Sequence, residues 1–385
     1  MTDEYDVIII GLGAMGSAAA HHLTKVGQRV LGLDRFQPPH HFGSSHGRTR
    51  IIREAYFEHP LYVPLVQRAY ELWHELEQQS GRQLLQQIGG LMIGASNGVI
   101  VCGARRSAEE HHLSHRVLSA ADVRQQFPAF HLGSDMVAVW EPRAGILAPE
   151  MAVQAHLELA AKQGADLRFS TSARGWEPRG AGVLVRTASE TFAAGRLLLS
   201  AGAWINSLVP GLNLPLTVER QVMCWFEPRS QPELFRSQRC PIFICEHAPR
   251  RSFYGFPDLG DGVKIGVHHE GAAASPDHLD REVKEHETET ASALLRQFLP
   301  NAAGPLRSAV ACMYTNTPDD HFLFDWHPLF PQVLIASPCS GHGFKFSPVI
   351  GELAATLLSG GAPPFDLSLF KLARFAPNSA NLSPP

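Results

Sequence analysis

The sequence predicts an α/β fold with two domains, and three observations support this prediction. The chain opens with an apolar run, a G-x-G-x-x-G turn and an alanine-rich run, which is the order strand, turn and helix of a Rossmann-like βαβ unit. A second glycine-rich turn precedes a helical pattern near the other end of the chain. The length of 385 residues exceeds what one hydrophobic core usually takes.

The glycines of the opening turn have separate roles. Gly11 permits a sharp turn, Gly13 lets the backbone approach a pyrophosphate, and Gly16 lets the helix pack on the strand. The free N–H groups at the start of the helix attract the phosphates. A second apolar strand, residues 28–33, ends in Asp34, at about the expected distance of 20 residues, where a carboxylate accepts bonds from ribose hydroxyls. The pattern favours a dinucleotide other than NADP. The alternative is a tight βα turn in an unrelated α/β protein.

Composition and charge exclude several classes of protein. Apolar residues make up 44% of the chain and charged residues 18%, as in a globular enzyme. A net charge of −4, with both signs interspersed, gives no basis for binding nucleic acid. No apolar run reaches the ~18 residues of a membrane helix. The N-terminus lacks a signal-peptide pattern, so we expect no membrane association and a cytoplasmic protein.

Cysteine and histidine spacings predict no metal site. The six cysteines are scattered without C-x-x-C pairs, which indicates neither a disulfide framework nor a zinc site. His111 and His115 have the spacing that would place two imidazoles on one helix face, but their neighbours are polar or charged. A solvated helix is the better interpretation of that segment.

A long loop, residues 35–48, follows the nucleotide-binding unit and is rich in Pro, His, Gly and Ser. Loops of this length in compact domains are usually functional. The loop leads into Arg48, Arg50 and Arg53, which flank an apolar pair. We expect at least one of these arginines to face the cofactor or an anionic substrate; the alternative is a solvated basic strand edge.

The middle of the chain alternates between helical and strand patterns. An apolar strand over residues 196–200 is followed by Ala201-Gly202, small residues that let a backbone pass close to a cofactor. This return strand predicts that the first domain is discontinuous. In a strand over residues 263–268, alternation places Lys264 and His268 on one face, and a lysine there most often lies at a solvent edge. Helices are predicted over residues 61–78, 119–127, 149–163 and 280–298.

The second glycine turn spans residues 340–346 and feeds a helix over residues 347–358, with Pro348 in its first turn. A helix N-terminus is a second place that stabilises negative charge. Two such turns, one at each end of the chain, suit a cofactor with two charged ends. FAD has this character, because its pyrophosphate and its reduced isoalloxazine are both anionic.

Over nearly its whole length the chain resembles the monomeric sarcosine oxidase and N-methyltryptophan oxidase family. The resemblance implies a discontinuous FAD-binding domain of the glutathione-reductase type and a mixed-sheet substrate domain. We place the former in residues 1–84, 149–214 and 316–385 and the latter in residues 85–148 and 215–315. The resemblance rests on Gly11 to Gly16, His46-Gly-x-Thr-Arg-x-Ile-Arg53, Tyr254-Gly-Phe-Pro257 with Lys264 and His268, Cys312-Met-Tyr-Thr315 and Ser340-Gly-His-Gly-Phe-Lys-Phe346.

The resemblance also implies roles for single residues. Cys312 would carry the flavin through a thioether, Arg53 and Lys345 would hold the substrate carboxylate, and Lys264 would face oxygen. The other residues that would line the flavin or substrate side are Arg50, Tyr254, His268 and Tyr314. Cofactor contacts are expected from Gly11, Gly13, Gly16, Asp34, Arg35, Ser45, His46, Thr49, Ala173, Gly202, Trp204, Cys312, Gly341, Gly343 and Lys345.

The implied reaction is the oxidation of a secondary amine in a small amino acid, with O2 reduced to H2O2 by a monomeric enzyme. An electropositive site would anchor the carboxylate and disfavour the unreactive ammonium form. Lys345 near the flavin would also stabilise the reduced anion. Glycine-, alanine- and aromatic-derived N-methyl amino acids, N-methyltryptophan among them, stay open as substrates, as do cyclic imino acids such as proline and pipecolate.

Two alternatives and two departures accompany this interpretation. A flavin dehydrogenase using another electron acceptor is disfavoured by Lys264, and an FAD-binding subunit of an RNA-modifying assembly by the lack of basic charge. Arg48 stands where the family commonly has Asp, and Cys339 stands where an apolar residue is expected. Either cysteine, Cys312 or Cys339, would serve equally as a small buried hydrophobe.

Overall fold

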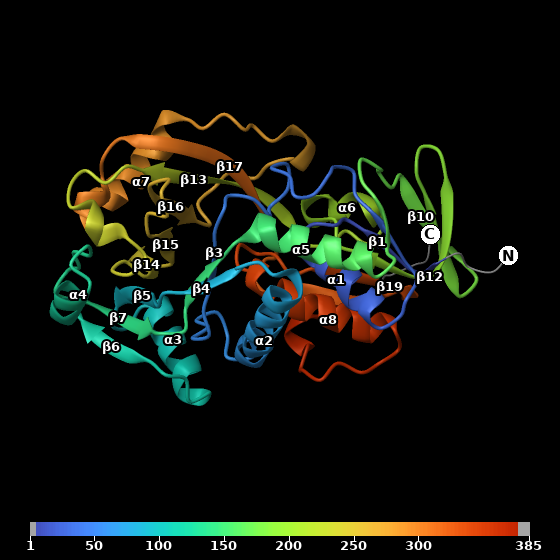
Figure 1. Ribbon diagram of the computed structural model, residues 1–385, viewed down its shortest axis with the longest axis horizontal. Helices are drawn as coiled ribbons and strands as arrows, with labels where there is room; N and C mark the ends of the chain where they lie inside the picture. Colours follow the sequence, from blue (N-terminus) through green and yellow to red (C-terminus); the bar gives the residue numbers. More distant parts are fainter. Residues whose placement is uncertain (1–4, 376–385) are drawn as a thin grey trace.

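The computed structural model describes residues 5–375, so the two ends of the predicted FAD-binding domain, residues 1–4 and 376–385, lie outside the described residues. Two eight-stranded sheets form two lobes, and a three-stranded sheet lies between them (Figure 1). Within residues 5–375, no helix is both long and apolar enough to cross a membrane.

The first sheet is built around the opening strand. β1 (Tyr5–Ile10) lies parallel to β12 and β2, with Ile8 opposite Leu197 and Leu31. Its apolar run is buried, as expected for a parallel strand covered on both faces. The order is β10 (Gly175–Arg179), β11 (Gly182–Arg186), β12 (Thr191–Leu199), β1, β2 (Val30–Leu33) and β9 (Asp166–Arg168); β19 (Phe330–Ser337) pairs with β12, and β18 (Leu323–His327) pairs with β19.

Three helices pack together on this sheet: α1 (Ala14–Lys25), α5 (Pro149–Lys162) and α8 (Ser347–Leu358) (Figure 1). A glycine permits the closest contact, because a Cβ on Gly351 of α8 would lie 2.6 Å from the carbonyl carbon of Ala18 in α1. A fourth helix, α2 (Tyr62–Ser80), contacts α5 and α8. The glycine turn before α1 is therefore held between sheet and helices.

The second sheet is mixed and carries its own hydrophobic core. Helix α7 (Glu285–Phe298) packs on β13 and β16 through Ala291, Leu295 and Phe298. The strand order is β17 (Leu306–Asn316), β13 (Thr217–Phe226), β16 (Val263–His268), β15 (Arg251–Phe256), β14 (Ile242–Ala248), β5 (Gly90–Ala95), β7 (Met136–Glu141) and β6 (Arg116–Ser119). The small sheet is β3 (Arg50–Ile52), β8 (Gly145–Leu147) and β4 (Leu85–Gln87).

Strand membership supports the predicted division into domains, which stays a proposal. Among the described residues, the strands of the first sheet come from the three predicted FAD-binding segments, and those of the second sheet come from the two substrate segments, except that β17 ends one residue beyond them, at Asn316. The three-stranded sheet takes strands from both, since β3 lies in one predicted segment and β8 in another.

Two local expectations were wrong at helix ends. The helix expected from residue 280 begins at Glu285, because the Arg220 guanidinium holds the carbonyl oxygens of Asp280 and Glu282 outside the helix. Helix α3 (Val99–Glu110) ends before His111, so that histidine and His115 do not share a helix face. Helix α4 (Ala120–Gln126), capped by the side chain of Ser119, confirms the prediction for its segment.

Candidate active site

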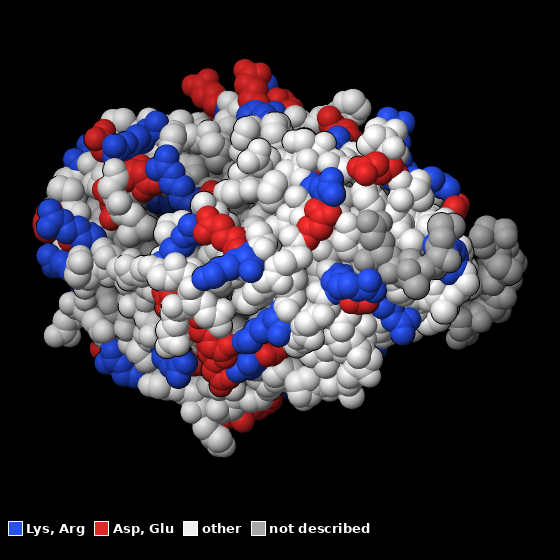
Figure 2. All heavy atoms as spheres, turned by 45° about the vertical axis from the view of Figure 1, so that its right-hand side comes forward, with Lys and Arg blue, Asp and Glu red and all other residues white. Residues whose placement is uncertain are grey.

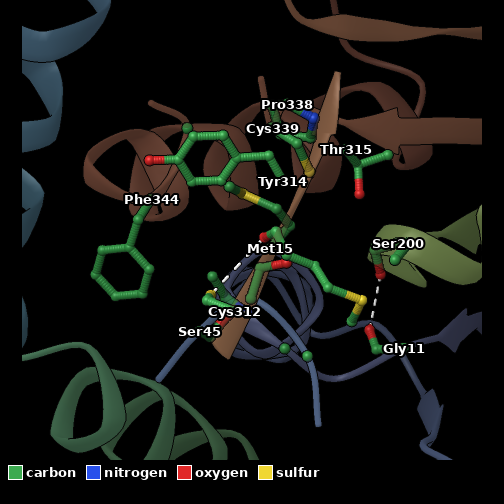
Figure 3. Close-up of a pocket in the computed structure, with 18 of the residues that line it drawn as sticks. Gly11, Met15, Ser45, Ser200, Cys312, Tyr314, Thr315, Pro338, Cys339 and Phe344 are labelled. Atoms are coloured by element: carbon green, nitrogen blue, oxygen red, sulfur yellow. Dashed lines mark hydrogen bonds between the residues drawn. The ribbon is translucent and has the colours of Figure 1, made fainter. Parts of the chain in front are cut away.

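One cavity is lined by residues of both large sheets and by the glycine turns at each end of the chain. Figure 3 shows Gly11 and Ser200 at one side of it, Tyr314 and Cys339 at another, and Cys312 drawn close to Ser45. Most of the predicted site residues line it: Gly11, Gly13, Asp34, Arg35, Ser45, Thr49, Arg50, Arg53, Ala173, Gly202, Trp204, Tyr254, His268, Cys312, Tyr314, Gly341, Gly343 and Lys345. Gly16, His46 and Lys264 do not belong to its lining.

The first glycine turn has the geometry that its sequence predicts. Gly11 adopts a left-handed φ of +95°, and a Cβ on Gly16 would lie 1.8 Å from the Gly11 carbonyl oxygen. The hydroxyl of Ser200 donates to that same carbonyl at 2.8 Å (Figure 3). The space beside the Cα of Gly13 is open, since a Cβ added there would meet only Ser45 Oγ, at 3.7 Å. The turn is rigid on its protein side and accessible on its cavity side.

Asp34 binds the protein's own backbone. Its carboxylate accepts the N–H of Leu12 at 2.7 Å and that of Phe36 at 2.8 Å. Burial raises the pKa of Asp34, and the two backbone hydrogen bonds oppose the shift. Because the carboxylate also lines the cavity, it joins the glycine turn to the second strand at the place where a ribose is expected.

The segment between β16 and α7 crosses the rim of the cavity. Asp277 accepts hydrogen bonds from Arg35 at 2.8 Å and from the indole N–H of Trp204 at 2.9 Å. Close by, the Arg281 guanidinium donates to the carbonyl oxygens of His41 and Phe42. The loop after β2 is therefore tied to the other lobe through side chains.

Arg53 lies in the cavity wall but is already paired. Its guanidinium, in a side chain 1% exposed, donates to both oxygens of Glu58 at 2.7 and 2.6 Å and to the Ala55 carbonyl at 3.1 Å. Burial opposes ionisation of Glu58, but the positive charge and hydrogen bond of Arg53, together with the neighbouring groups Lys345 and His342, outweigh it and lower the pKa of the carboxyl. Nε of Arg53 has no partner among the described residues.

Lys345 is a buried cation on the same wall. Its ammonium donates to the carbonyl oxygen of His342 at 2.6 Å and to the hydroxyl of Tyr56 at 3.3 Å. Burial lowers the pKa of Lys345 to about 7; Arg53 acts in the same direction and Glu58 against it. The side chain can therefore change its charge near neutral pH.

Lys264 does not lie at a solvent edge, so that alternative is wrong. The side chain is 2% exposed, and its ammonium donates to the carbonyl oxygens of Gly47 and Thr49 at 2.7 and 3.2 Å and to Thr49 Oγ1 at 3.0 Å. It lies over the rings of Trp225 and Phe256. Burial lowers the pKa of Lys264 well below its usual value, and the positive charge of Arg50 acts in the same direction.

Tyr314 and His268 meet above the second glycine turn. His268 Nδ1 lies 3.2 Å from the Tyr314 hydroxyl, and a Cβ on Gly341 would come within 2.7 Å of Tyr314 and 2.8 Å of His268. Burial lowers the pKa of His268 and raises those of Tyr314 and Tyr254. Arg50 donates to the carbonyl oxygens of Thr49 and Ser44, which leaves it directed along the loop.

Cys312 and Cys339 both line the cavity, so the structure brings both candidate thiols to the site. Cys312 lies in β17 opposite Gln221 of β13. Burial raises the pKa of Cys339 to about 11. The other departure, Arg48, has a partner at the surface: its guanidinium donates to Asp261 at 2.6 Å.

The cavity residues fit a dinucleotide. Two buried polar atoms at the cavity, Thr315 Oγ1 and Arg53 Nε, have no partner within residues 5–375, and polar atoms buried in this way need one. At the first turn, the open side of Gly13 leaves room for a pyrophosphate. His46 is buried behind this wall with its Nε2 unpartnered, and burial lowers its pKa to about 3.

Sequence reasoning missed four side chains that organise the site: Tyr56, Glu58, Glu141 and His342. Glu141 accepts the backbone N–H groups of Glu54 and Ala55 at 2.6 and 2.8 Å, which fixes the segment that carries Arg53. Tyr56 and Glu58 follow Arg53 closely in the chain, and His342 lies within the second glycine turn, so proximity to a predicted site residue was the signal available.

Known proteins match this chain closely. The family described as FAD dependent oxidoreductase matches residues 6–357. A monomeric sarcosine oxidase from Streptomyces avermitilis is 44% identical, over 98% of this chain and 99% of that protein. An N-methyl-L-tryptophan oxidase from Yersinia pestis is 37% identical, over 97% of this chain and 100% of that protein. The solved open form of NikD, an amino acid oxidase essential for nikkomycin biosynthesis, shares the fold with a TM-score of 0.84 at 24% identity, over 96% of this chain and 98% of that one.

The charge distribution agrees with the expectation from composition. On the face shown in Figure 2, basic and acidic side chains are interspersed. The ion pairs of the described residues include Arg106 with Glu110 and Arg68 with Glu352. The buried cations described above are thus the distinctive electrostatic feature of the cavity.

Proposed function

The chain belongs to the family of FAD-dependent oxidoreductases, and from this premise we propose that it oxidises amino acids whose amine is secondary, in the manner of a sarcosine oxidase. One observation carries the proposal: two buried cationic side chains, Arg53 and Lys345, lie in the wall of one cavity with the aromatic residues Tyr254 and Tyr314. Relatives named for sarcosine and N-methyl-L-tryptophan, each matched over nearly the whole chain, support it.

The chain's own residues would hold the cofactor by the two glycine turns and by the rim of the cavity. When bound, FAD accepts a hydride equivalent from the carbon next to the amine nitrogen and passes the electrons to O2. Gly13 leaves room for the pyrophosphate, and Thr315 offers an unpaired hydroxyl within the cavity. We propose that Cys312 holds the flavin covalently, as the resemblance implies.

Substrate binding would use the two buried cations. Arg53 and Lys345 would hold the carboxylate, each through a charge-assisted hydrogen bond. The positive field beside the cavity disfavours a second positive charge, so a bound substrate would lose its ammonium proton more easily. Tyr254, Tyr314 and His268 would form the wall beside the reacting carbon, with His268 neutral because burial lowers its pKa.

Lys264 would act after the substrate has reacted. Its buried ammonium would stabilise the negative charge that oxygen gains on reduction to H2O2. We propose that the enzyme works as a monomer in the cytoplasm and that a small amino acid and O2 are its partners.

The test is a panel of substrates offered to the purified, yellow protein. Sarcosine, N-methylalanine, N-methyltryptophan, proline and pipecolate are each supplied in air, and H2O2 is measured directly. We expect H2O2 at a rate above background from at least one N-methyl amino acid. Reduction of an added quinone without H2O2 would instead identify a dehydrogenase, and no turnover of any secondary amine would overturn the proposal.

A further inference from the structure

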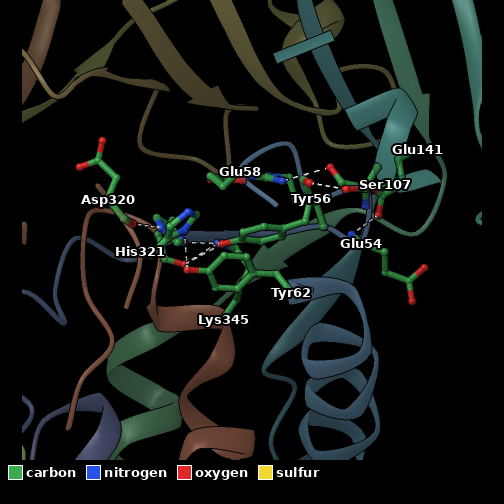
Figure 4. Close-up of polar contacts among 12 residues, drawn as sticks. Glu54, Tyr56, Glu58, Tyr62, Ser107, Glu141, Asp320, His321 and Lys345 are labelled. Atoms are coloured by element: carbon green, nitrogen blue, oxygen red, sulfur yellow. Dashed lines mark hydrogen bonds and ion pairs between the residues drawn. The ribbon is translucent and has the colours of Figure 1, made fainter. Parts of the chain in front are cut away.

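Next to Lys345, two buried side chains, Tyr56 and the cavity-lining His342, form a hydrogen-bonded row to which the proposed reaction assigns no role. The hydroxyl of Tyr56 lies 3.3 Å from the Lys345 ammonium and 2.6 Å from Nδ1 of His342. Nε2 of His342 lies 2.9 Å from the carbonyl oxygen of Asp320. Figure 4 shows this row, with Lys345 and Tyr56 at one end and Asp320 at the other.

The carbonyl oxygen at the end of the row determines where each proton lies. A carbonyl oxygen only accepts, so Nε2 of His342 carries a hydrogen. Burial lowers the pKa of His342 to about 3, so the ring is neutral and its Nδ1 is an acceptor. The Tyr56 hydroxyl must then donate to Nδ1. The Tyr56 oxygen then accepts a hydrogen bond from Lys345. All donors in the row therefore point the same way, from the lysine through Tyr56 to the His342 ring.

The same two residues occupy two of the three N–H groups of Lys345. One N–H is directed to the Tyr56 hydroxyl, and another to the carbonyl oxygen of His342 at 2.6 Å. The backbone of the lysine is held as well, because the indole N–H of Trp73 donates to its carbonyl oxygen at 2.9 Å. Among the described residues the ammonium finds these two acceptors, which leaves the third N–H for the cavity that Lys345 lines.

We propose that Tyr56 and His342 are positioning residues for Lys345: they direct one of its N–H groups to the substrate carboxylate and help the lysine to keep its proton. Tyr56 is fully buried and does not line the cavity, so it acts through the lysine. The inference rests on the proposed function, because that function assigns Lys345 to the carboxylate.

Because Lys345 titrates near neutral pH, the loss of one hydrogen-bond acceptor can be measured as a change in its pKa. Burial lowers the pKa of Lys345 most; Arg53 and Arg50 also lower it, Glu58 raises it, and the neutral His268 lies nearby. An acceptor stabilises the charged form. Removing the Tyr56 hydroxyl should therefore lower the pKa of Lys345 further, while an unrelated loss of packing should not move it in this way.

The experiment measures binding of propionate to the flavin-loaded protein, through the flavin absorbance, across the neutral pH range. In the parent, affinity should fall as pH rises and Lys345 loses its charge. In Tyr56→Phe this fall should move to lower pH by about 1 unit or more, the size expected for one hydrogen bond to a charged group. The control is Tyr62→Phe, a buried neighbour with ring centroids 4.7 Å apart, whose hydroxyl bonds to His321 and to the backbone N–H of Phe322.

Substitution of the ring provides a second route if Tyr56→Phe fails to fold. His342→Leu, which removes the acceptor, should shift the pH profile in the same direction, and His342→Asn, which keeps a side-chain acceptor, should restore it. Unshifted profiles in Tyr56→Phe and His342→Leu, with Lys345→Met losing the pH dependence, would overturn the positioning role and leave the proposed function standing. If Lys345→Met binds propionate as the parent does, the carboxylate contact fails and the positioning role fails with it, whereas the proposed oxidation is decided separately by turnover in the substrate panel.

Discussion

Arg53 and Glu58 form a buried ion pair, with Nη2 of the arginine 2.6 Å from Oε2 of the glutamate, in the cavity where a substrate carboxylate is expected. The arginine is thus already neutralised by a carboxylate of the protein. A substrate that binds Arg53 must share it with Glu58 or replace it. This relationship makes the affinity for carboxylates depend on a residue of the same charge as the ligand.

We predict that Glu58→Gln binds propionate about tenfold more tightly or better, because Arg53 loses its counter-charge and gains from an added one. Without ligand the variant should be less stable by about 3–5 kcal/mol, the usual result of leaving one partner of a buried pair. Titration of the flavin spectrum and chemical unfolding, each with and without propionate, measure the two effects. Glu54→Gln is the control, since Glu54 pairs with Arg143 and does not line the cavity. Equal affinities in parent and Glu58→Gln would show that Arg53 does not meet the carboxylate.

Because Lys264 is buried, we can predict its effect on the reaction of the reduced enzyme with oxygen. Its charge matters only when negative charge appears on oxygen, so Lys264→Met should slow reoxidation by orders of magnitude, while anaerobic reduction by substrate changes little. Stopped-flow traces of the two half-reactions, recorded separately, measure this. Lys162→Met, at an exposed end of α5, is the matched control. If reoxidation keeps its parent rate in Lys264→Met, the lysine has a structural role, and the dehydrogenase alternative returns.

The covalent link can be tested by acid precipitation. If Cys312 carries the flavin, the yellow colour should stay in the pellet of the parent and of Cys339→Ala, and it should move to the supernatant in Cys312→Ala. Both thiols line the cavity, so the pair of variants is a fair comparison. Colour released by Cys339→Ala alone would transfer the link to that residue.

Glu141 should make stability depend on pH. Burial raises the pKa of Glu141 from 4.5 to about 7 in the folded protein, against the two backbone hydrogen bonds that it accepts. Between these two values the folded state binds more protons than the unfolded one, so this group's contribution to stability is full at acid pH and is lost as pH rises toward 7. Its size should be a few kcal/mol, since each unit of pKa difference is about 1.4 kcal/mol.

The measurement is the free energy of unfolding of the parent and of Glu141→Gln, by chemical denaturation, at several pH values. Other groups titrate as well, so the difference between the two proteins is the quantity of interest. The difference should change in favour of the variant as pH rises toward 7. A difference that does not vary with pH would mean that Glu141 keeps an ordinary pKa.

Local sequence patterns were enough to predict much of the fold. The opening βαβ unit, the capping of α4 by Ser119 and the bounds of α8 (Ser347–Leu358) follow from residues that lie close together in the chain. Glycine at position 11 and proline at 348 act through their own backbone angles, which need no distant partner. For the same reason the two glycine turns could be named from local sequence patterns, whereas most other residues of the cavity lining were named from the family resemblance.

Only the tertiary structure decided which partner each charged side chain has. The alternating pattern of its strand places Lys264 where a solvent-facing lysine would lie. The side chain is nevertheless buried, because Trp225, Phe256 and the carbonyl oxygen of Gly47 surround it. Arg48 meets Asp261, distant in the chain, at the surface. Burial, and with it the pKa of a charged group, depends on what packs around the group from other parts of the chain, and the spacing of residues along one segment does not contain that information.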